Sequence, residues 1–417
     1  MKLTVVGGGS TYTPELIDGF ARLRDSLPVT ELVLVDPAKD RLDLVGGLAQ
    51  RIFAKQGHPG RVVTTSNLDE GIEGADAVLL QLRVGGQAAR NQDETWPLDC
   101  GCVGQETTGA GGLAKALRTV PVVLDIAERV RRTNPDAWII DFTNPVGIVT
   151  RALLTEGHKA VGLCNVAIGF QRRFAKFLGV TPEEVALDHI GLNHLTWERA
   201  VTVNGENVLP KLLAAHGQEL ADDLHLPREL LLQLGVVPSY YLRYYYAHDE
   251  VVRELLTKPS RAAEVAKIEQ ELLDLYADPT LDEKPALLEQ RGGAYYSEAA
   301  VALASSLLND TGDVQVVNTL NNGALPFLPD DAVIEVPATV GAAGTTPLPI
   351  SPLEPLYAGL VANVTAYENL ALDAALKGGA ERVFNALLAH PLVGQIEYAN
   401  ALTDKLLAHN REYLPWA

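Results

Sequence analysis

The sequence contains little cysteine, and three residues in a chain of 417 do not make a disulfide framework. They are Cys100, Cys102 and Cys164. The sequence also has no apolar run approaching the roughly 18 residues of a membrane-spanning helix. A first β-type run that begins at Leu3 leaves no room for a signal peptide before it. We therefore expect a cytoplasmic protein that does not bind a membrane.

Positive charge is scarce as well. Lysine and arginine number 34 against 53 acidic residues, which gives a formal net charge of −19. Such a charge repels nucleic acid and anionic lipid, so neither is expected as a partner. A small anionic substrate would need a local cluster of Arg or Lys that works against the overall field. The remaining composition, 47% hydrophobic and 21% charged, is typical of a globular protein.

The N-terminal part of the chain alternates short apolar runs with helix-like segments. This alternation predicts an α/β fold, in which a Rossmann-like, doubly wound parallel sheet occupies residues 1–165. The runs that predict its strands are LTVV from Leu3, ELVLVD ending at Asp36, DAVLLQL at 76–82, AWIIDF at 137–142 and AVGLC ending at Cys164.

A glycine turn follows the first run and precedes a helix-like stretch. Gly7 and Gly9 have the G-x-G spacing that lets a backbone approach a pyrophosphate, with Ser10 beside them. The third glycine of the usual fingerprint is replaced by Tyr12. Asp36 lies at the distance expected for an acid on a ribose hydroxyl, which predicts NAD and disfavours NADP. The alternative is that Asp36 is an ordinary acid at the end of a strand.

Residues 166–417 mix helical and β-type segments, and we expect an α+β substrate domain packed on the sheet, as in lactate and malate dehydrogenases. The Gly- and Pro-rich stretch 341–355 is predicted to be a surface connection. Apolar helices often pair subunits, so a homodimer or homotetramer is expected. The predicted helices cover 261–276, 355–376 and 395–409, and the β-type runs are VQVVNTL and AVIEVP.

Two polar motifs in the first domain have alternative interpretations. Asn144 in DFTNPVG follows a strand, where α/β sheets present ligands, but it could equally be part of a plain turn. The stretch GQETTGAGG at 104–112 is either a loop that covers a cofactor or a surface loop without a ligand.

Cys164 and His194 are candidate metal ligands. Cys164 ends a predicted strand, and His194 lies in GLNHLTW among apolar neighbours. A single cysteine is usually a small buried hydrophobe, and a single histidine is usually a satisfied core residue. Two ligands are too few for a structural zinc site, but they suffice for an open site that substrate oxygens and water complete. Composition and spacing leave these alternatives open.

Several motifs in order resemble glycoside hydrolase family 4, the glycosidases that depend on NAD and a divalent metal. The resemblance runs from residue 1 to near the C-terminus and is greatest to the family's 6-phospho-β-glucosidases. The motifs that carry it are GGGSTYTPE, GQETTGAGG, FTNPVG, GLCNV, GLNH, YLRYYY, RGGAYYS, VVNTLNNG, LPDDAVIEVP and AHPLV.

The resemblance implies that Cys164 and His194 bind the metal, usually manganese, and that NAD is the cofactor. It implies hydrolysis of 6-phospho-β-glucosides through oxidation, elimination, addition and reduction, a route unlike that of most glycosidases. Asn165 stands where relatives that cleave α-linked substrates carry Asp; it has no titratable proton and is expected to orient a substrate hydroxyl. Ala167 departs from the Pro of β-type members and leaves the aglycone or sugar preference open.

The resemblance also implies roles for residues further along the chain. Tyr241 is expected to be the base, activated by the metal or by Arg243, although an aromatic helix face would also explain the tyrosines of this segment. Arg291 and then Arg90 are the candidate ligands of the sugar phosphate, because arginine binds a phosphate in bidentate fashion. Asn144 is expected to contact sugar hydroxyls. The substrate is thus a phosphorylated disaccharide or β-glucoside.

Two other functions fit a dinucleotide-binding chain. An NAD-dependent 2-hydroxy-acid dehydrogenase would share the fold but release NADH and need no metal. A non-catalytic NAD-binding redox sensor would bind the cofactor without turnover. The combination of Cys164, His194 and Tyr241 argues against both.

Overall fold

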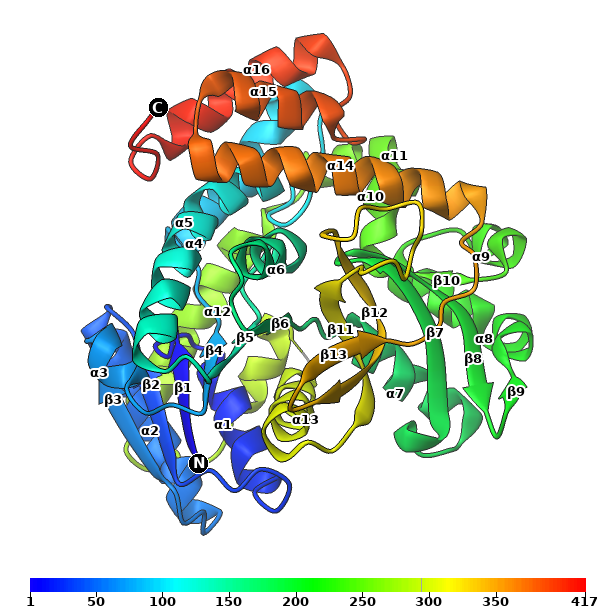
Figure 1. The fold of residues 1–417 in the computed structure, drawn as a ribbon. Coiled ribbons are helices and arrows are strands. Elements are labelled where there is room, and N and C mark those ends of the chain that lie inside the picture. The colour runs from blue at the N-terminus through cyan, green and yellow to red at the C-terminus, as the bar shows by residue number, and fades with distance from the viewer. Residues whose placement is uncertain (294) are drawn as a thin grey trace.

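The structure is a computed structural model that describes residues 1–293 and 295–417. A nine-stranded sheet forms its centre, in the order β13-β12-β11-β6-β5-β4-β1-β2-β3 (Figure 1). Its strands are β1 (Lys2–Val6), β2 (Glu31–Val35), β3 (Arg61–Thr65), β4 (Ala77–Leu80), β5 (Trp138–Asp141), β6 (Ala160–Gly162), β11 (Asp313–Leu320), β12 (Val333–Gly341) and β13 (Gly344–Pro347).

Strands β1 to β6 pair in parallel, and their spatial order 3-2-1-4-5-6 is that of a Rossmann fold. This confirms the predicted doubly wound sheet. Two of the strands were not anticipated. β3 is a five-residue edge strand in which only the second residue is fully buried. β13 lies inside the stretch that was expected to be a surface connection. Strands β11 to β13 are antiparallel and extend the sheet beyond β6.

Helices cover both faces of this sheet, as the alternation of side chains along its strands requires. In β4, Ala77 and Leu79 pack into the core on one face, whereas Val78 and Leu80 pack into the core on the other. The first face carries α1 (Thr13–Arg22), α2 (Lys39–Lys55), α12 (Arg261–Tyr276) and α13 (Tyr296–Asn309). The second carries α3 (Leu68–Ile72), α5 (Gly109–Thr133), α6 (Val146–Thr155) and α14 (Pro355–Lys377).

A second, smaller sheet lies beside the first and packs on it through β7 and β12. It contains β7 (Val185–Leu192), β8 (Leu195–Val203), β9 (Glu206–Asn207) and β10 (Val237–Pro238). The helices around it are α7 (Val166–Leu178), α8 (Leu209–Leu224), α9 (Arg228–Leu234), α10 (Arg243–Tyr246) and α11 (His248–Leu255). At the C-terminus, α15 (Ala380–Ala389) packs on α14, and α16 (Ile396–Asn410) packs on α15.

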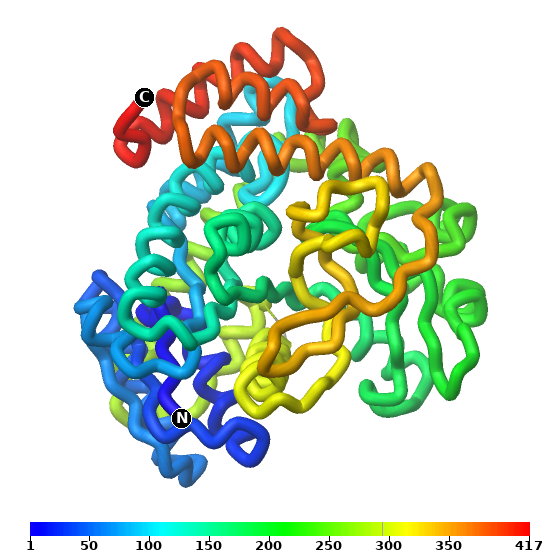
Figure 2. Tube along the Cα trace, in the orientation of Figure 1, coloured from blue at the N-terminus to red at the C-terminus, as the bar shows by residue number. Residues whose placement is uncertain are grey.

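The C-terminal helices pack against helices of the N-terminal half of the chain. Helix α14 crosses over α5 and α6, and α15 and α16 also contact α5 (Figures 1 and 2). The three predicted helices of the second half therefore exist within a residue of their expected bounds. Among the described residues, no helix is both long and apolar enough to cross a membrane.

Candidate active site

A cavity of about 770 Å³ lies at the carboxyl ends of the parallel strands, where this fold presents ligands. The glycine turn after β1, the end of β2 and the segment after β4 form its wall. Charged side chains from several elements face it. The polar residues of the lining include Ser10, Asp36, Arg41, Gln81, Arg83, Lys115, Asn144, Glu269 and Arg291.

The glycine turn brings main chain to the cavity wall. Gly7 has a φ of 87°, and a Cβ there would lie 2.7 Å from the carbonyl oxygen of Gln81, so only glycine fits without a shift. The Gly9 amide donates to Asp36 Oδ2 at 3.0 Å. The Asp36 carboxylate thus lies beside the turn, at the end of β2, and both line the cavity together with Ser10. Both features suit a dinucleotide.

Cys164 and His194 come from different sheets and are both buried. Cys164 follows β6, and His194 occupies the turn between β7 and β8 with a φ of 63°. Burial raises the pKa of the Cys164 thiol, while hydrogen bonds from the Asn193 side chain and the backbone at Val166 favour the thiolate. Burial lowers the pKa of His194 to about 4, so the imidazole is neutral at pH 7.

The surroundings of His194 suit metal coordination. Its Nδ1 lies 3.0 Å from Thr107 Oγ1. When Nδ1 donates its proton to this hydroxyl, the lone pair of Nε2 is left for a cation, as in most histidine–metal sites. Among the described residues, no group of three or more His, Cys, Asp and Glu side chains is placed to hold a metal. The donors present therefore fit an open site of one thiolate and one imidazole.

Tyr241 lies directly on His194. Their rings stack with centroids 3.6 Å apart and an interplanar angle of 10°. Burial raises the pKa of the Tyr241 phenol well above its usual value, and the charge of Cys164 raises it further. The Arg90 guanidinium acts in the opposite direction and lowers it. Cys164, His194 and Tyr241, which are far apart in sequence, therefore form one buried cluster.

Arg243, which was expected beside the metal as a cation that could activate Tyr241, is directed elsewhere. Arg243 Nη1 donates to the Tyr240 hydroxyl at 2.7 Å, and its other nitrogen pairs with Glu254. Arg90 is the cation whose charge acts on the phenol. The packing considered for the tyrosines is also present, because Tyr241, Tyr244 and Tyr245 belong to one apolar cluster, although Tyr240–Leu242 is a 3₁₀ turn and α10 begins only at Arg243.

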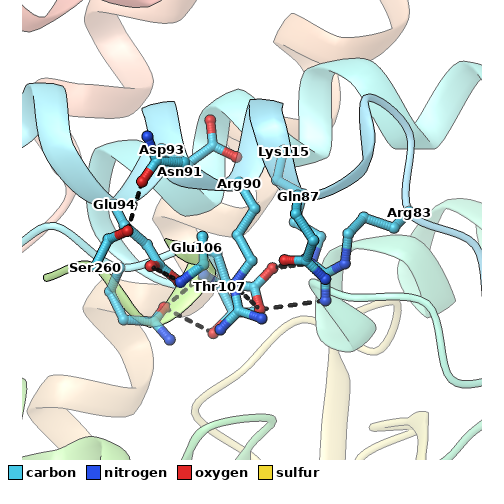
Figure 3. Close-up of polar contacts among 12 residues, drawn as sticks. Arg83, Gln87, Arg90, Asn91, Asp93, Glu94, Glu106, Thr107, Lys115 and Ser260 are labelled. Atoms are coloured by element: carbon cyan, nitrogen blue, oxygen red, sulfur yellow. Dashed lines mark hydrogen bonds and ion pairs between the residues drawn. The ribbon is translucent and has the colours of Figure 1, made fainter. Parts of the chain in front are cut away.

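The stretch at 104–112 is not a surface loop. Most of its residues are buried, and Gly109 to Gly112 are the first turn of α5. Its Glu106 carboxylate is surrounded by Arg83, Arg90 and Lys115 (Figure 3), with Lys115 Nζ 2.6 Å from Oε2 and Arg90 Nε 3.1 Å from Oε1. Burial and the neighbouring Arg83 lower the pKa of Lys115 to about 7. Positive side chains are thus gathered here in an otherwise acidic protein.

The predicted substrate residues occupy different positions. Arg291 lines the cavity, but its guanidinium donates to Glu269 Oε1 at 3.0 Å and to Thr11. Asn144 also lines the cavity, and its Oδ1 is buried without a hydrogen-bond partner among the described residues. Arg90 lies near Tyr241 and pairs with Glu94 at 2.7 Å. Asn165 precedes the first turn of α7, next to Cys164.

Sequence reasoning missed the residues that support these groups: Arg83, Glu106, Thr107, Lys115, Asn193, Tyr296 and Glu335. Glu106 and Thr107 belong to the motif at 104–112, which was interpreted as a loop and not as buried. Asn193 immediately precedes His194. Glu335 had no sequence signal beyond its place within an apolar run, where an isolated acid needs a buried partner.

Comparison with known proteins extends these observations. A model of family 4 glycosyl hydrolases matches residues 2–180, and a model of that family's C-terminal domain matches residues 189–393. The chain is 40% identical over 430 residues to a probable 6-phospho-beta-glucosidase of Bacillus subtilis, and the alignment covers 100% of this chain and 97% of that protein.

Solved structures agree. The 6-phospho-beta glucosidase of Thermotoga maritima with manganese, NAD+ and glucose-6-phosphate has a TM-score of 0.91 and 35% identity, over 99% of both chains. A malate dehydrogenase of Cryptosporidium parvum, 15% identical, has a TM-score of 0.56 over 90% of this chain and 98% of its own. The second likeness concerns the fold alone and confirms the dehydrogenase-like arrangement.

Proposed function

Because the chain belongs to family 4 of the glycosyl hydrolases, we propose that it hydrolyses 6-phospho-β-glucosides by an oxidation, elimination, addition and reduction route that needs NAD and manganese. The relatives named 6-phospho-beta-glucosidase support this substrate class. The observation that carries the proposal is the cluster of Cys164, His194 and Tyr241, in which the tyrosine ring lies 3.6 Å from the imidazole ring.

Gly7, Gly9 and Ser10 hold the pyrophosphate of NAD, and Asp36 accepts hydrogen bonds from its adenosine ribose. The main chain of the glycine turn lines the cavity, and Asp36 lies beside Gly9, and both observations support this assignment. Cys164 and His194 hold the divalent cation, since one is a buried sulfur stabilised by hydrogen bonds and the other a neutral imidazole. When bound, NAD supplies a reversible hydride acceptor and the cation supplies a Lewis acid for sugar oxygens.

Tyr241 removes the proton from carbon 2 of the sugar. Its phenol is buried and needs positive charge nearby to ionise, and Arg90 is the side chain that favours the ionised form. Where little water is present, the effective dielectric constant is low, so the attraction between Arg90 and an ionised phenol is stronger than in bulk water. Asn165 orients a sugar hydroxyl next to Cys164, and as an amide it cannot protonate a leaving group, which supports the β-type reaction.

The substrate enters from the cavity. Asn144 contacts sugar hydroxyls, which would give its unpartnered Oδ1 a donor. Arg291 and Arg90 bind the 6-phosphate, and because each is held by a carboxylate, their geometry is fixed before the ligand arrives. The side chains of Arg83, Arg90 and Lys115 around Glu106 supply a local positive potential. This potential attracts the anionic substrate, which the net charge of −19 would otherwise repel.

We further propose that residues 1–165 act as the cofactor unit and 166–417 as the metal and substrate unit. Strands β11 to β13 of the second unit extend the sheet of the first, so the two share a core. The chain is proposed to work as a homodimer or homotetramer, and exposed apolar residues on the C-terminal helices, such as Leu356 and Ile396, support this. A cytoplasmic location suits three free cysteines.

A panel of chromogenic α- and β-glycosides, each with and without a 6-phosphate, tests the proposal. With NAD and manganese present, only the β-linked 6-phosphoglycosides should release the chromophore, and adding a chelator should abolish release. Steady accumulation of NADH with a 2-hydroxy acid, without a metal requirement, would instead support a dehydrogenase. Binding of NAD without turnover of any glycoside would support a redox sensor.

A further inference from the structure

One buried carboxylate lies where the two sheets meet. Glu335 belongs to β12, and β12 packs against β7 of the smaller sheet. The carboxylate takes three hydrogen bonds: from His189 at 3.0 Å, from Asn193 Nδ2 at 2.8 Å and from Asn318 Nδ2 at 2.9 Å. The side chain is 2% exposed. The proposed reaction does not use Glu335 directly.

Two of these donors lead to the proposed metal ligands. Asn193 is the neighbour of His194, and its side chain also hydrogen bonds to Cys164. Asn318 lies in β11 and pairs with Gly162 of β6, two residues before Cys164. Glu335 therefore ties the turn that carries His194 to the strand that carries Cys164. No element of secondary structure includes both ligands, so such a link is needed to fix their separation.

The third donor adds charge to this arrangement. His189 lies between Glu335 and Glu198, with Nδ1 2.5 Å from Glu198 Oε1, and all three side chains are buried. The two carboxylates raise the pKa of His189 to about 10, which makes it an imidazolium. His189 and the two asparagines lower the pKa of Glu335. Burial raises the pKa of Glu198, whereas the pKa of Glu335 is lowered, so the negative charge behind the Cys164–His194 pair is that of the Glu335 carboxylate, which little water screens.

We propose that Glu335 is a positioning residue of the metal site, which aligns Cys164 with His194 through Asn193 and Asn318 and supplies negative charge behind the cation. The inference rests on the proposed function, because it takes Cys164 and His194 as the ligands. Partners outside the ligand set commonly change metal affinity by about 10- to 100-fold when they are replaced.

Glu335→Gln tests this with little change of shape. Its amide oxygen can still accept from Asn193 and Asn318, while its NH₂ group faces His189, which can become neutral and keep its hydrogen bond to Glu198. Manganese affinity is measured by electron paramagnetic resonance of free Mn²⁺, with NAD and glucose 6-phosphate present. Affinity should fall by about 10- to 100-fold, with NAD affinity and the metal-free melting temperature near those of the unchanged protein.

Glu368→Gln is a control that replaces a buried carboxyl near His194 without removing a charge, because burial raises the pKa of Glu368 to about 8. Glu368 is also buried and lies in the lining of a small cavity with Asn193 and His194, but it makes no hydrogen bond to Asn193. Its replacement should leave manganese affinity unchanged. If Glu335→Gln does not fold, Asn193→Ala cuts the same link at a half-buried position and should weaken Mn²⁺ binding in the same direction.

Cobalt distinguishes failure of this inference from failure of the proposed function. The Co²⁺ complex of the unchanged protein should show a thiolate-to-cobalt charge-transfer band that Cys164→Ser removes. If that band is present but Glu335→Gln binds Mn²⁺ as tightly as the unchanged protein, Glu335 is merely structural and the inference is overturned. If the unchanged protein shows no such band, the proposed metal ligands themselves are wrong.

Discussion

The rings of His194 and Tyr241 stack face to face, with their centroids 3.6 Å apart. The contact joins the turn between β7 and β8 to the 3₁₀ segment before α10. In the proposed reaction, this contact places the base next to the metal ligand, close to the cation that would acidify the proton the base removes. The same contact restrains the phenol ring, because the two rings are nearly parallel, with an interplanar angle of 10°.

Replacing Tyr241 with Phe keeps the stacked ring and removes only the phenol. We expect turnover to fall by roughly 100-fold or more, the usual effect of losing a general base, with the melting temperature little changed. Deuterium on carbon 2 of the substrate should slow the unchanged enzyme, and product formed in heavy water should carry deuterium there. Tyr244→Phe, in the next turn, is the control and should keep turnover. A near-normal rate for Tyr241→Phe, or product without exchange, would exclude Tyr241 as the base.

Cys164→Ser and His194→Ala should each abolish turnover that depends on manganese. NAD binding should persist, because the glycine turn lies on a separate element from either ligand. Activity is measured with the phosphoglycoside, and NAD affinity by titration of protein fluorescence. Cys102→Ser is the matched control, since Cys102 is also buried and lies near Cys100. Full activity of either site variant in the presence of a chelator would refute the metal assignment.

Much of this architecture could be predicted from the sequence, because the strands of a parallel sheet are buried on both faces and appear as apolar runs. β3 escaped prediction because it is an edge strand with polar threonines at its end, and β13 because GTTP carries a glycine and a proline. The resemblance to a family identified Cys164, His194 and Tyr241 as a group, whereas spacing alone left each with a structural alternative.

The supporting residues could not be predicted in the same way. Glu106 is held by cations from the segment after β4, from α4 (Gly86–Thr95) and from α5, so its surroundings exist only in the folded chain. Arg243 was misjudged for the same reason. It is close to Tyr241 in sequence, but its guanidinium is directed to Glu254 in α11. Two residues that are close in sequence can direct their side chains to different neighbours when a 3₁₀ turn separates them.

The enzyme should prefer NAD to NADP, because the Asp36 carboxylate at the end of β2 would repel a 2′-phosphate. Asp36→Ser should reduce this preference, measured as the ratio of kcat/KM for the two cofactors, by about 10-fold or more, or about 1.4 kcal/mol. Arg41, which also lines the cavity, places a positive charge near this position. Asp40→Ser changes an exposed acid in the first turn of α2 and should leave the ratio unchanged. Equal use of NADP by the unchanged enzyme would contradict the role given to Asp36.

The stability of the fold should depend on pH through Glu368. Burial raises the pKa of this carboxyl from 4.5 to about 8, and its Oε2 has no hydrogen-bond partner among the described residues. Between these two values the folded protein binds a proton at Glu368 that the unfolded chain does not. The stabilisation from this proton is therefore complete below pH 4.5 and is lost as the pH rises towards 8.

Glu368→Gln removes this titration while it keeps the size of the side chain. The melting temperature of the variant relative to that of the unchanged protein should rise between pH 5 and pH 8, and stop rising above that range. Calorimetric scans of both proteins in the same buffers give this difference. Asp141, whose pKa burial also raises to about 8, titrates in both proteins and cancels from it. A difference that stays constant with pH would show that Glu368 is already ionised in the folded protein, and would refute the raised pKa.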